Sequence, residues 1–385
     1  MYKIKLLNKI SPVGLAQLPK TAYQCAEDME EPDGIIVRSA AMHDMELPAS
    51  LKAIARAGAG TNNIPIDKCS EKGIVVFNTP GANANAVKEL VICGMLMSAR
   101  KVYPGMCWVQ SLKGQGDEVG KLVEKGKSKF AGPELKGKKL GVIGLGAIGV
   151  LVCNAARHFG MEIYGYDPFL SVNAAWNISS GIHHASSLQE IYENCDFISL
   201  HLPLNNETRG MINAASINSM KHGVRLLNFA RAGLVDTDDL LAALEERQIY
   251  VYVTDFPTDE LLGHPGVLAI PHLGASTPES EENCAEMAAN ELREYLENGN
   301  IINAVNMPSV QVPRSGRPRI GVVHQNKPNM ISQITGVVGE NINNLTNNSR
   351  GDYAYSLLDI DGTVTDAMVE GLQEIEGVIR INVLP

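Results

Sequence analysis

The stretch from residue 140 to residue 149, LGVIGLGAIG, decides the fold of the middle of the chain. Leu140, Val142 and Ile143 form a short apolar strand that runs directly into Gly144. Apolar residues then recur at helical spacing, which predicts an amphipathic helix. A strand, a glycine-rich turn and a helix in this order begin a parallel α/β unit.

The turn carries the pattern G-x-G-x-x-G, a dinucleotide-binding signature when it joins a strand to a helix. Gly144 permits the tight turn, Gly146 lets the backbone approach a pyrophosphate, and Gly149 lets helix and strand pack closely. The free N–H groups of the helix N-terminus, at Ala147 and Ile148, would face the phosphates. The motif therefore predicts a dinucleotide site; a glycine-rich turn that binds nothing is the alternative.

Asp167 stands 18 residues after Gly149, at the end of the next predicted strand. Its carboxylate would accept hydrogen bonds from the ribose hydroxyls and would repel a 2′-phosphate. Pro168 and Phe169 supply no compensating arginine. The sequence therefore predicts NAD rather than NADP as cofactor.

Short apolar runs alternate with helical patterns through the rest of this region, which predicts a doubly wound parallel sheet. Its further strands are expected at 163–167, 196–200, 224–230, 250–256 and 267–270. Another α/β region precedes it, with strands expected at 3–8, 34–38, 53–57 and 75–78. A helix starting at Thr277 and Pro278 and ending near Glu297 returns the chain to that first region.

The last 67 residues follow a proline-rich stretch and show the order β-α-β-β-α-β, which is ferredoxin-like. We therefore expect three domains: a discontinuous flavodoxin-like domain that binds the substrate, a Rossmann-type NAD domain and a small α+β domain. Their expected bounds are 1–98 plus 281–306 for the first, 99–280 for the NAD domain, 307–318 for a linker and 319–385 for the last.

Composition narrows the class of protein. The 385 residues are 45% hydrophobic and 20% charged, with a formal net charge of −10. This balance is globular, and a net-acidic surface disfavours a nucleic-acid partner. Lys121–Lys129, the one notable basic cluster, is interpreted as a solvated loop. No apolar run approaches membrane-spanning length, and seven scattered cysteines without a C-x-x-C pair indicate neither disulfides nor a metal site. We expect a soluble, cytoplasmic protein with no membrane partner.

Charged and acid–base side chains follow the predicted strands of the middle region. Arg231, Asp255, Glu260 and His272 all lie just past strand ends. The carboxyl ends of parallel strands share one edge of the sheet, so these groups are expected to converge there. A cation, a base and a partner for that base are what hydride transfer from a hydroxy acid requires besides the nicotinamide.

At this point the residues resemble those of the D-isomer-specific 2-hydroxyacid dehydrogenases over nearly the whole chain. The resemblance rests on AGAGTNNI at 57–64, FNTPGANANAVKELV at 77–91, GKKLGVIGLGAIG at 137–149, SLHLPLNNETRGMI at 199–212, NFARAGLVD at 228–236 and PHLGAST at 271–277. Within that family the pattern is most similar to enzymes that act on 3-phosphoglycerate, in the first step of L-serine biosynthesis.

The resemblance implies roles for the catalytic set. Arg231 would hold the substrate carboxylate, and His272 would take the hydroxyl proton. Glu260 would pair with His272, and Asp255 would face the nicotinamide. The adjacent Asp259 is the alternative partner of His272, because a slip of one residue exchanges the two carboxylates.

The resemblance also implies substrate groups in the first domain. The Arg38–Ser39 pair and Asn83 match positions that bind the substrate. Enzymes acting on 3-phosphoglycerate often carry a second arginine just after this pair, where Ala40 and Ala41 stand here. Lys127 or Lys129 could supply the missing positive charge.

The last domain resembles an ACT domain, the small ligand-binding module of amino-acid metabolism. The positions that match a serine site are His324, Asn326 and Asn344, which implies feedback by L-serine. A structural dimerisation module with solvated polar residues is the alternative. Either version implies a homodimer or a homotetramer.

Two other functions remain open. One is a glyoxylate/hydroxypyruvate reductase or another D-2-hydroxyacid reductase. The other, of a different class, is an NAD-sensing corepressor-like binding protein, which the complete set Arg231, Glu260 and His272 disfavours.

Overall fold

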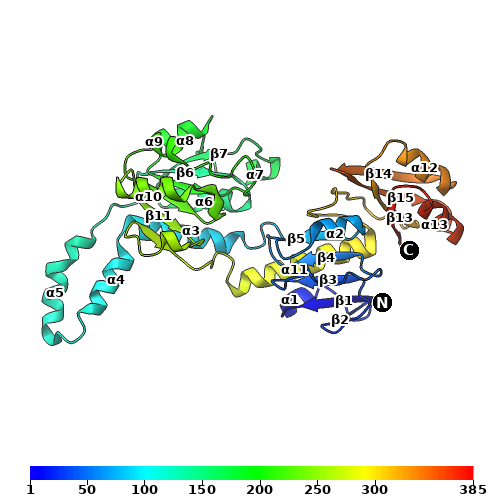
Figure 1. Cartoon of the computed structure of the whole chain (residues 1–385), viewed down its shortest axis with the longest axis horizontal. Helices are drawn as coiled ribbons and strands as arrows, with labels where there is room; N and C mark the ends of the chain where they lie inside the picture. Colours follow the sequence, from blue (N-terminus) through cyan, green and yellow to red (C-terminus); the bar gives the residue numbers. More distant parts are fainter. Residues whose placement is uncertain (385) are drawn as a thin grey trace. The chain divides into compact units, whose positions relative to one another are not determined.

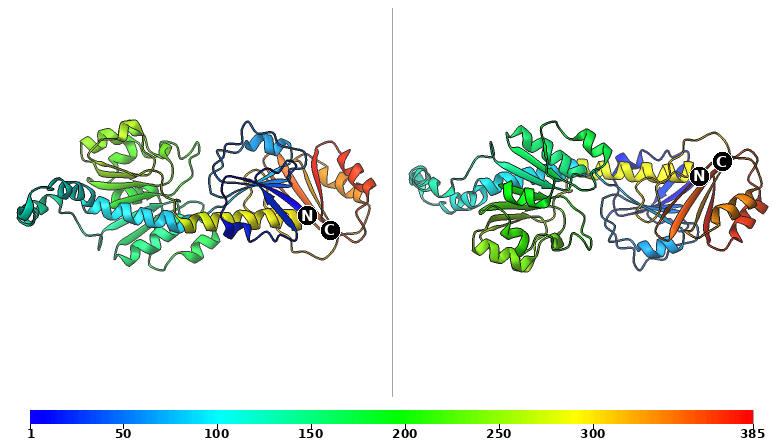
Figure 2. Two further views of the ribbon diagram at one scale, coloured as in Figure 1. Left: turned by 90° about the horizontal axis from the view of Figure 1, so that it is seen from below. Right: turned by 90° about the horizontal axis from the view of Figure 1, so that it is seen from above.

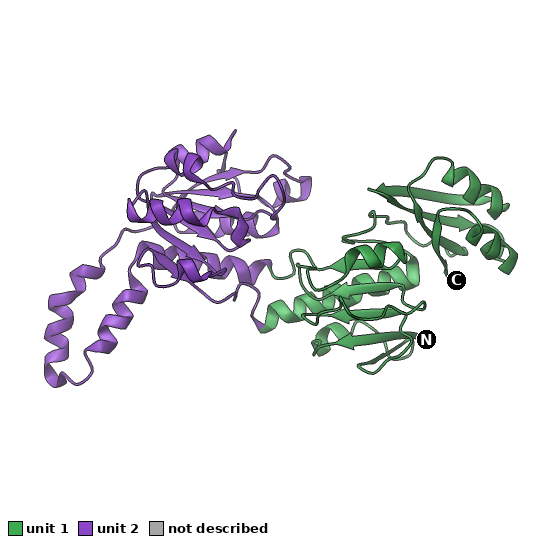
Figure 3. Cartoon of the chain, viewed as in Figure 1, with its two compact units in different colours: residues 1–83, 278–385 green, residues 84–277 purple. Residues whose placement is uncertain are grey.

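The structure is a computed structural model that describes residues 1–384. Its chain forms two compact units (Figure 3). Unit 1 contains Met1–Asn83 and Pro278–Pro385, and unit 2 contains Ala84–Thr277. Unit 1 is thus built from two separated stretches of chain, and the C-terminal residues belong to it.

Unit 2 is built on a parallel sheet of seven strands in the order β12-β11-β10-β9-β6-β7-β8. Strands β6, β7 and β11 of this sheet are labelled in Figure 1. The order reverses between β6 and β9, which is the switch point where ligands bind in doubly wound sheets. The strands are β6 (Lys139–Ile143), β7 (Glu162–Tyr166), β8 (His183–His184), β9 (Phe197–Leu200), β10 (Val224–Asn228), β11 (Ile249–Thr254) and β12 (Val267–Ala269).

Helices cover both faces of this sheet, so both faces are buried. Because alternate residues of a strand point to opposite sides, neighbouring residues enter different cores. Leu227 packs in one core with α3 and α6, and Leu226 packs in a second core with α8 and α10. The helices of the unit outside its helical arm are α3 (Ala84–Ala99), α6 (Ala147–His158), α7 (Val172–Asn177), α8 (Leu188–Asn194), α9 (Ala214–Asn218) and α10 (Thr237–Glu245), with short 3-10 turns η3 (Ala232–Leu234) and η4 (Asp259–Leu261).

A helical arm extends from the sheet of unit 2 (Figure 1). It consists of α4 (Val102–Ser111), η1 (Gly116–Glu118), α5 (Val119–Gly126) and η2 (Lys127–Phe130). The interpretation of 121–129 as a loop is therefore wrong. Lys121 and Lys127 each pair with a glutamate three residues earlier, which supports helical backbone at this place.

Unit 1 contains a parallel sheet of five strands in the order β2-β1-β3-β4-β5. Helix α11 (Pro278–Asn298) packs Ala288 and Leu292 against Ile4 and Ala55 of this sheet. The edge strand β2 was not expected from the sequence. The remaining elements are β1 (Tyr2–Leu7), β2 (Tyr23–Ala26), β3 (Gly34–Val37), β4 (Ala53–Arg56), β5 (Val75–Asn78), α1 (Pro12–Leu15) and α2 (Ile66–Glu71).

The C-terminal part of unit 1 is an antiparallel sheet in the order β14-β15-β13-β16. Helices α12 and α13 cover one face of it (Figure 2), where Ile320 and Val322 are buried. On the other face, Val323 and Tyr355 join the core of the five-stranded sheet. The elements are β13 (Arg319–Gln325), α12 (Met330–Val338), β14 (Ile342–Arg350), β15 (Tyr353–Ile360), α13 (Asp366–Gln373) and β16 (Val378–Leu384), which is the expected β-α-β-β-α-β order.

The segment expected to be a linker, 307–318, is packed rather than extended in solvent. Met307, Val310 and Val312 are buried in the core of unit 1. The buried Arg319 that follows bonds Asp359 and three backbone carbonyls, one of them that of Val312. The apolar residues between the prolines of this segment therefore hold it against the core of unit 1.

The expected boundary at residue 98 also differs from the structure. It falls inside α3, which lies wholly in unit 2 because Val87, Val91 and Met95 pack in a core with β6 and β10. No helix of the described residues is long and apolar enough to cross a membrane.

Candidate active site

The glycine loop joins β6 to α6 at the switch point of unit 2. Gly144 has a φ of +94°, and a Cβ placed there would lie 2.5 Å from the carbonyl oxygen of His201. A Cβ on Gly149 would lie 1.9 Å from the carbonyl oxygen of Gly144. A Cβ on Gly146 would meet no atom within 4 Å. Two glycines are thus required by packing, and the third borders open space.

That open space and the helix end beside it suit a pyrophosphate. Gly146 is the N-cap of α6 and provides no side-chain hydrogen bond to the first turn, at Ala147 and Ile148. Free N–H groups at a helix N-terminus attract phosphate. The residues present therefore fit a dinucleotide.

Asp167 follows β7 and is tied to the glycine loop. Its Oδ2 accepts a hydrogen bond of 2.8 Å from the backbone N–H of Leu145, and its Oδ1 accepts one of 2.8 Å from that of Phe169. Each carboxylate oxygen retains acceptor capacity for a ribose hydroxyl. The hydrogen bond from Leu145 in the glycine loop thus fixes the side chain of Asp167.

A histidine that the sequence analysis did not single out also borders this loop. His201 follows β9, and its Nε2 lies 2.9 Å from the Oγ of Ser199. Burial lowers the pKa of His201 to about 4, so its ring is neutral near pH 7. Its carbonyl oxygen occupies the space that a Cβ on Gly144 would need, so His201 lies beside the loop.

Arg231 lies in the loop between β10 and η3, and the buried Asn228 fixes that loop. The Oδ1 of Asn228 accepts hydrogen bonds from the N–H groups of Ala230 and Arg231, at 3.2 and 3.3 Å. Its Nδ2 donates to the carbonyl of Arg231 at 2.9 Å. Asn228 therefore fixes the backbone while the guanidinium of Arg231 stays exposed, which makes it a positioning residue that sequence reasoning missed.

Asp255 and His272 come from the ends of β11 and β12. Asp255 is only 1% exposed, and its Oδ1 is buried without a hydrogen-bond partner in the described chain. Burial raises the pKa of Asp255, while the neighbouring His272, the backbone N–H of Gly274 and the guanidinium of Arg231 oppose the rise. The structure thus brings Asp255, Arg231 and His272 within electrostatic reach of one another, and the ring of His272 packs on Phe256 with centroids 4.6 Å apart.

Glu260 is placed differently from the expected partner of His272. It lies in the exposed turn η4, and its own backbone N–H lowers its pKa. Over residues 1–384 neither Glu260 nor its neighbour Asp259 is hydrogen-bonded to His272. A three-residue turn at the surface leaves both carboxylates in solvent, so the pairing stays a prediction.

In unit 1, cationic and polar groups gather at the carboxyl ends of β1, β3 and β4. The guanidinium of Arg38, just after β3, pairs with Glu281 at 2.5 Å. Arg56, the last residue of β4, donates from Nε to the carbonyl of Arg38 at 3.1 Å. The structure therefore places a second arginine beside Arg38, in a position that the strand-end rule applied to Arg231 could have found.

Two further predicted residues of unit 1 follow strands: Ser39 comes two residues after β3, and Asn83 comes five residues after β5. Asn8, just after β1, accepts hydrogen bonds with Oδ1 from the backbone N–H groups of Ser39 and Ala40, at 2.9 and 2.7 Å. Asn83 is half-buried at the last residue of the first stretch of unit 1. Asn8 thus fixes the backbone that follows Arg38, a role not foreseen from the sequence.

The lysines considered for the phosphate lie in the helical arm of unit 2. Lys127 pairs with Glu124, and Lys129 lies over the ring of Trp108 at 5.6 Å. Both lysines therefore have partners within the arm.

The residues expected to bind serine are not brought together within one chain. His324 is buried, and its Nε2 contacts Ser356 and Asn347 at 3.0 and 3.2 Å. Strand register carries His324 through Ala354 to Ser349, and five residues of β14, about 17 Å of extended backbone, separate Ser349 from Asn344. Asn326 is exposed and donates from its side chain to the carbonyl of Gly351. Over residues 1–384 the side chains of His324 and Asn344 do not bond to each other; His324 contacts Asn347 instead, three residues along β14 from Asn344.

Comparison with known proteins identifies the class. Residues 92–274 match the family described as D-isomer specific 2-hydroxyacid dehydrogenase, NAD binding domain. D-3-phosphoglycerate dehydrogenase of Haemophilus influenzae is 30% identical over 358 residues, which cover 88% of this chain and 83% of that protein. The chain belongs to the D-isomer-specific 2-hydroxyacid dehydrogenases, and unit 2 contains its NAD-binding domain.

The chain is also similar to longer curated proteins. D-3-phosphoglycerate dehydrogenase of Bacillus subtilis is 33% identical over 328 residues, covering 80% of this chain and 60% of that protein. The chain spans about half to three fifths of the length of this and several other curated relatives that it matches.

Solved structures show the same fold. An NAD+-bound 3-phosphoglycerate dehydrogenase of Entamoeba histolytica has a TM-score of 0.60 and 29% identity, covering 79% of this chain and 98% of that one. A glyoxylate reductase of Paecilomyes thermophila has a TM-score of 0.65 and 25% identity over the same shares of the two chains.

Proposed function

We propose that this protein oxidises 3-phospho-D-glycerate to 3-phosphooxypyruvate with NAD, the first step of L-serine biosynthesis. The observation that carries the choice of substrate is the pair Arg38 and Arg56 at neighbouring strand ends of unit 1. A phosphate dianion needs more positive charge than a carboxylate does, and arginine matches its geometry. Arg56 therefore supplies the charge that Ala40 and Ala41 leave out.

The chemistry divides among the residues of unit 2. NAD, when bound at Gly144, Gly146, Gly149 and Asp167, supplies the acceptor for the hydride that leaves C2. Arg231 holds the carboxylate of the substrate and polarises C2. An imidazole nitrogen of His272 takes the hydroxyl proton as the C2–O bond becomes a carbonyl, and returns it in the reverse direction.

Two carboxylates assist His272 in this scheme. The buried Asp255, in its ionised form, favours the protonated ring that exists after proton transfer. Glu260 orients the ring once substrate is bound. Loss of most hydride transfer in Glu260→Ala, with Asp259→Ala retaining it, is expected; the opposite pattern would assign the role to Asp259.

The second candidate function is a glyoxylate/hydroxypyruvate or other D-2-hydroxyacid reductase, and the glyoxylate reductase fold favours it. The third, an NAD-sensing corepressor-like protein, fits poorly with a site in which Arg231, Asp255 and His272 converge. NADH oxidation with phosphohydroxypyruvate, hydroxypyruvate, glyoxylate, pyruvate and 2-oxoglutarate separates all three. A faster rate on hydroxypyruvate than on its phosphorylated form would contradict our proposal.

We propose that the C-terminal sheet is an ACT-type regulatory domain and that L-serine binds it across two chains. The register that separates His324 from Asn344 in one chain supports a site shared between chains. Unchanged rate and thermal midpoint with added L-serine would remove this part of the proposal.

We also propose a homodimer or homotetramer in the cytoplasm, with small molecules rather than nucleic acid or membrane as its partners. Exposed apolar side chains on α4 support self-association: Tyr103 is 56% exposed and Met106 is 62% exposed. All seven cysteines are free thiols, which fits a reducing compartment. Sedimentation of the wild type against Tyr103→Ser/Met106→Ser tests the assembly.

A further inference from the structure

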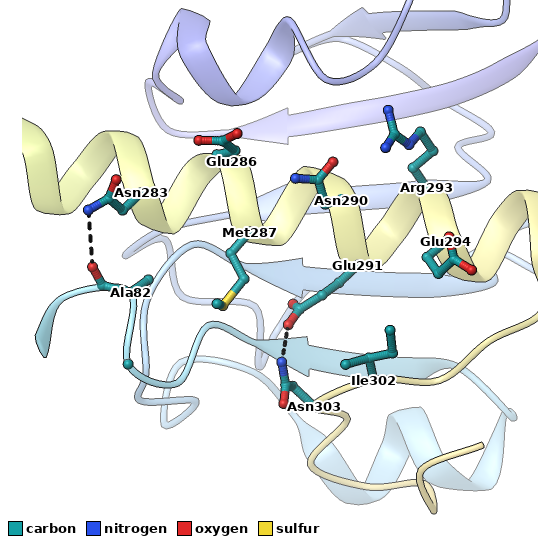
Figure 4. Close-up of a pocket in the computed structure, with 11 residues that line it drawn as sticks. Ala82, Asn283, Glu286, Met287, Asn290, Glu291, Arg293, Glu294, Ile302 and Asn303 are labelled. Carbon is teal, nitrogen blue, oxygen red and sulfur yellow. Dashed lines mark hydrogen bonds between the residues drawn. The ribbon is translucent and has the colours of Figure 1, made fainter. Parts of the chain in front are cut away.

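A pocket of about 640 Å³ lies in unit 1 along one side of α11 (Figure 4). Its other walls are the loop Gly81–Ala82 and the segment Ile302–Asn303. All of these residues belong to unit 1, and the sequence motifs discussed above do not include any residue of α11 that lines it. The pocket is therefore a feature separate from the glycine loop and from the arginine pair.

Glu291 is the notable side chain of this pocket. It is 95% buried, its Oε1 accepts a hydrogen bond of 2.7 Å from the Nδ2 of Asn303, and its Oε2 has no partner in the described chain. Figure 4 shows the side chain turned from α11 toward Asn303, on the same side as Met287. A buried carboxyl oxygen without a partner is costly, and such a group indicates a missing ligand or water.

Among residues 1–384 no cationic side chain forms an ion pair with Glu291. Burial raises its pKa to about 8, and the hydrogen bond from Asn303 only partly offsets that rise. The other titratable groups around the pocket are Glu286, Glu294 and Arg293, all on α11; the walls from Gly81–Ala82 and Ile302–Asn303 carry none. The pocket is thus lined by three carboxyl groups, including that of Glu291, and by one guanidinium. That guanidinium, of Arg293, donates to the backbone carbonyl of Gln17.

The remaining lining distinguishes an organic cation from a metal ion. Met287, Ile302 and Ala82 provide apolar surface, and Asn290 and Asn303 provide amide groups. Among the described residues no group of His, Cys, Asp and Glu is arranged to hold a metal ion. A charged N–H donor on a short apolar body satisfies both kinds of surface.

We propose that this pocket is a binding site for a small primary ammonium compound: the carboxyl group of Glu291 turns toward the pocket so that Oε2 accepts from the ammonium N–H, while the apolar part contacts Met287 and Ile302. Binding keeps the carboxyl ionised, so it releases a proton at neutral pH. The site stands whether or not 3-phosphoglycerate is the substrate.

Titration calorimetry with n-butylammonium chloride tests the site on the full chain. The ammonium stays charged up to pH 9, because amines of this kind have a pKa of about 10.4. With a carboxyl pKa of about 8, the ionised fraction of Glu291, and with it the affinity, rises about tenfold from pH 7 to pH 9. We expect n-butanol, which has the same shape and no charge, to give no heat.

Variants connect the signal to Glu291. Glu291→Gln keeps the acceptor for Asn303 and is expected to reduce the affinity at pH 9 at least tenfold and to abolish its pH dependence. Glu294→Gln is the matched control: it lies one turn away, and its carboxylate already accepts from Asn298 and Asn300, so affinity is expected to change less than threefold. Ile302→Trp, which fills the pocket, is expected to block binding with the carboxyl group intact.

Three results would overturn the proposal. One is the absence of binding to the wild type at pH 9, and another is equal binding by Glu291→Gln. The third is an affinity that falls as pH rises, because it would show that protonated Glu291 donates to an acceptor ligand.

Discussion

The two parallel sheets of the molecule use their carboxyl edges in different ways. In unit 2, backbone atoms shape the part of the edge at the glycine loop: Gly144, Gly146 and Gly149 leave room, and the first turn of α6 presents N–H groups. In unit 1, side chains shape it: Arg38 and Arg56 bring charge, and Asn8 fixes the loop between them. A site made of backbone depends on the absence of side chains, whereas a site made of side chains depends on their support.

The largest effect is expected where the edge of unit 2 performs chemistry. His272→Gln removes the proton acceptor, and loss of a positioned acid–base group lowers kcat about 10²–10⁴-fold. NADH binding, measured by fluorescence, should not change, because the cofactor loop lies on other strands. His264→Gln is the control, since His264 faces Glu245 at 3.2 Å, and it should keep full activity. Equal losses in the two variants would contradict the assignment.

Two glycine-to-alanine variants of the glycine loop separate a loss of packing from a loss of NAD binding. Gly149→Ala forces a Cβ to 1.9 Å from a backbone oxygen, so the free energy of unfolding should fall by about 1–3 kcal/mol and NAD binding should be lost. Gly146→Ala meets no protein atom within 4 Å and should unfold like the wild type, yet bind NAD about tenfold more weakly. Denaturant unfolding and NADH titration give both quantities. Normal NAD affinity in Gly146→Ala would show that the pyrophosphate lies elsewhere.

Much of the edge of unit 2 could be predicted from sequence, because close approach and positive φ allow only glycine at Gly144 and Gly149. These constraints act within one turn of chain, so they produce glycines at a fixed spacing in the sequence. Asn8 leaves no such spacing, and Arg56 could be recognised only as a residue at a strand end, since the roles of both arise from pairing between β1, β3 and β4, strands that are distant in sequence. The place of Glu260 was also beyond the sequence, because a 3-10 turn decides which way its carboxylate points.

The packing of the C-terminal sheet onto unit 1 was hidden for the same reason. The prolines of 307–318 indicated a linker, whereas the burial of Val310 and Val312 follows from a bridge to Ile301 and from contacts that only the fold creates. The β-α-β-β-α-β order was predictable from local patterns, but the face that meets the five-stranded sheet was not.

At the edge of unit 1, substitution in the arginine pair is expected to change KM, by less than His272→Gln changes kcat. Arg56→Gln should raise KM for phosphohydroxypyruvate about 10–100-fold, the value of one charge-assisted contact, and should change KM for hydroxypyruvate much less. Lys52→Gln, near the opposite end of β4, loses a partly exposed pair with Asp33 and a contact of the ammonium with the ring of Tyr2, both away from Arg56, and serves as control. Equal changes for the two substrates in Arg56→Gln would mean that the arginine does not recognise phosphate.

The smallest effect is expected at Asn8, which supports the arginine edge without touching substrate. Its φ is +74°, a conformation that glycine adopts freely and alanine resists. Asn8→Gly therefore removes only the hydrogen bonds to Ser39 and Ala40, and KM for the phosphorylated substrate should rise about threefold to tenfold at constant kcat. Asn8→Ala adds backbone strain of about 1–2 kcal/mol, which should appear in denaturant unfolding as lower stability than that of Asn8→Gly. If KM changed in neither variant, the loop after Arg38 would be held by the sheet alone, and the contrast between an edge made of backbone and one made of supported side chains would fail there.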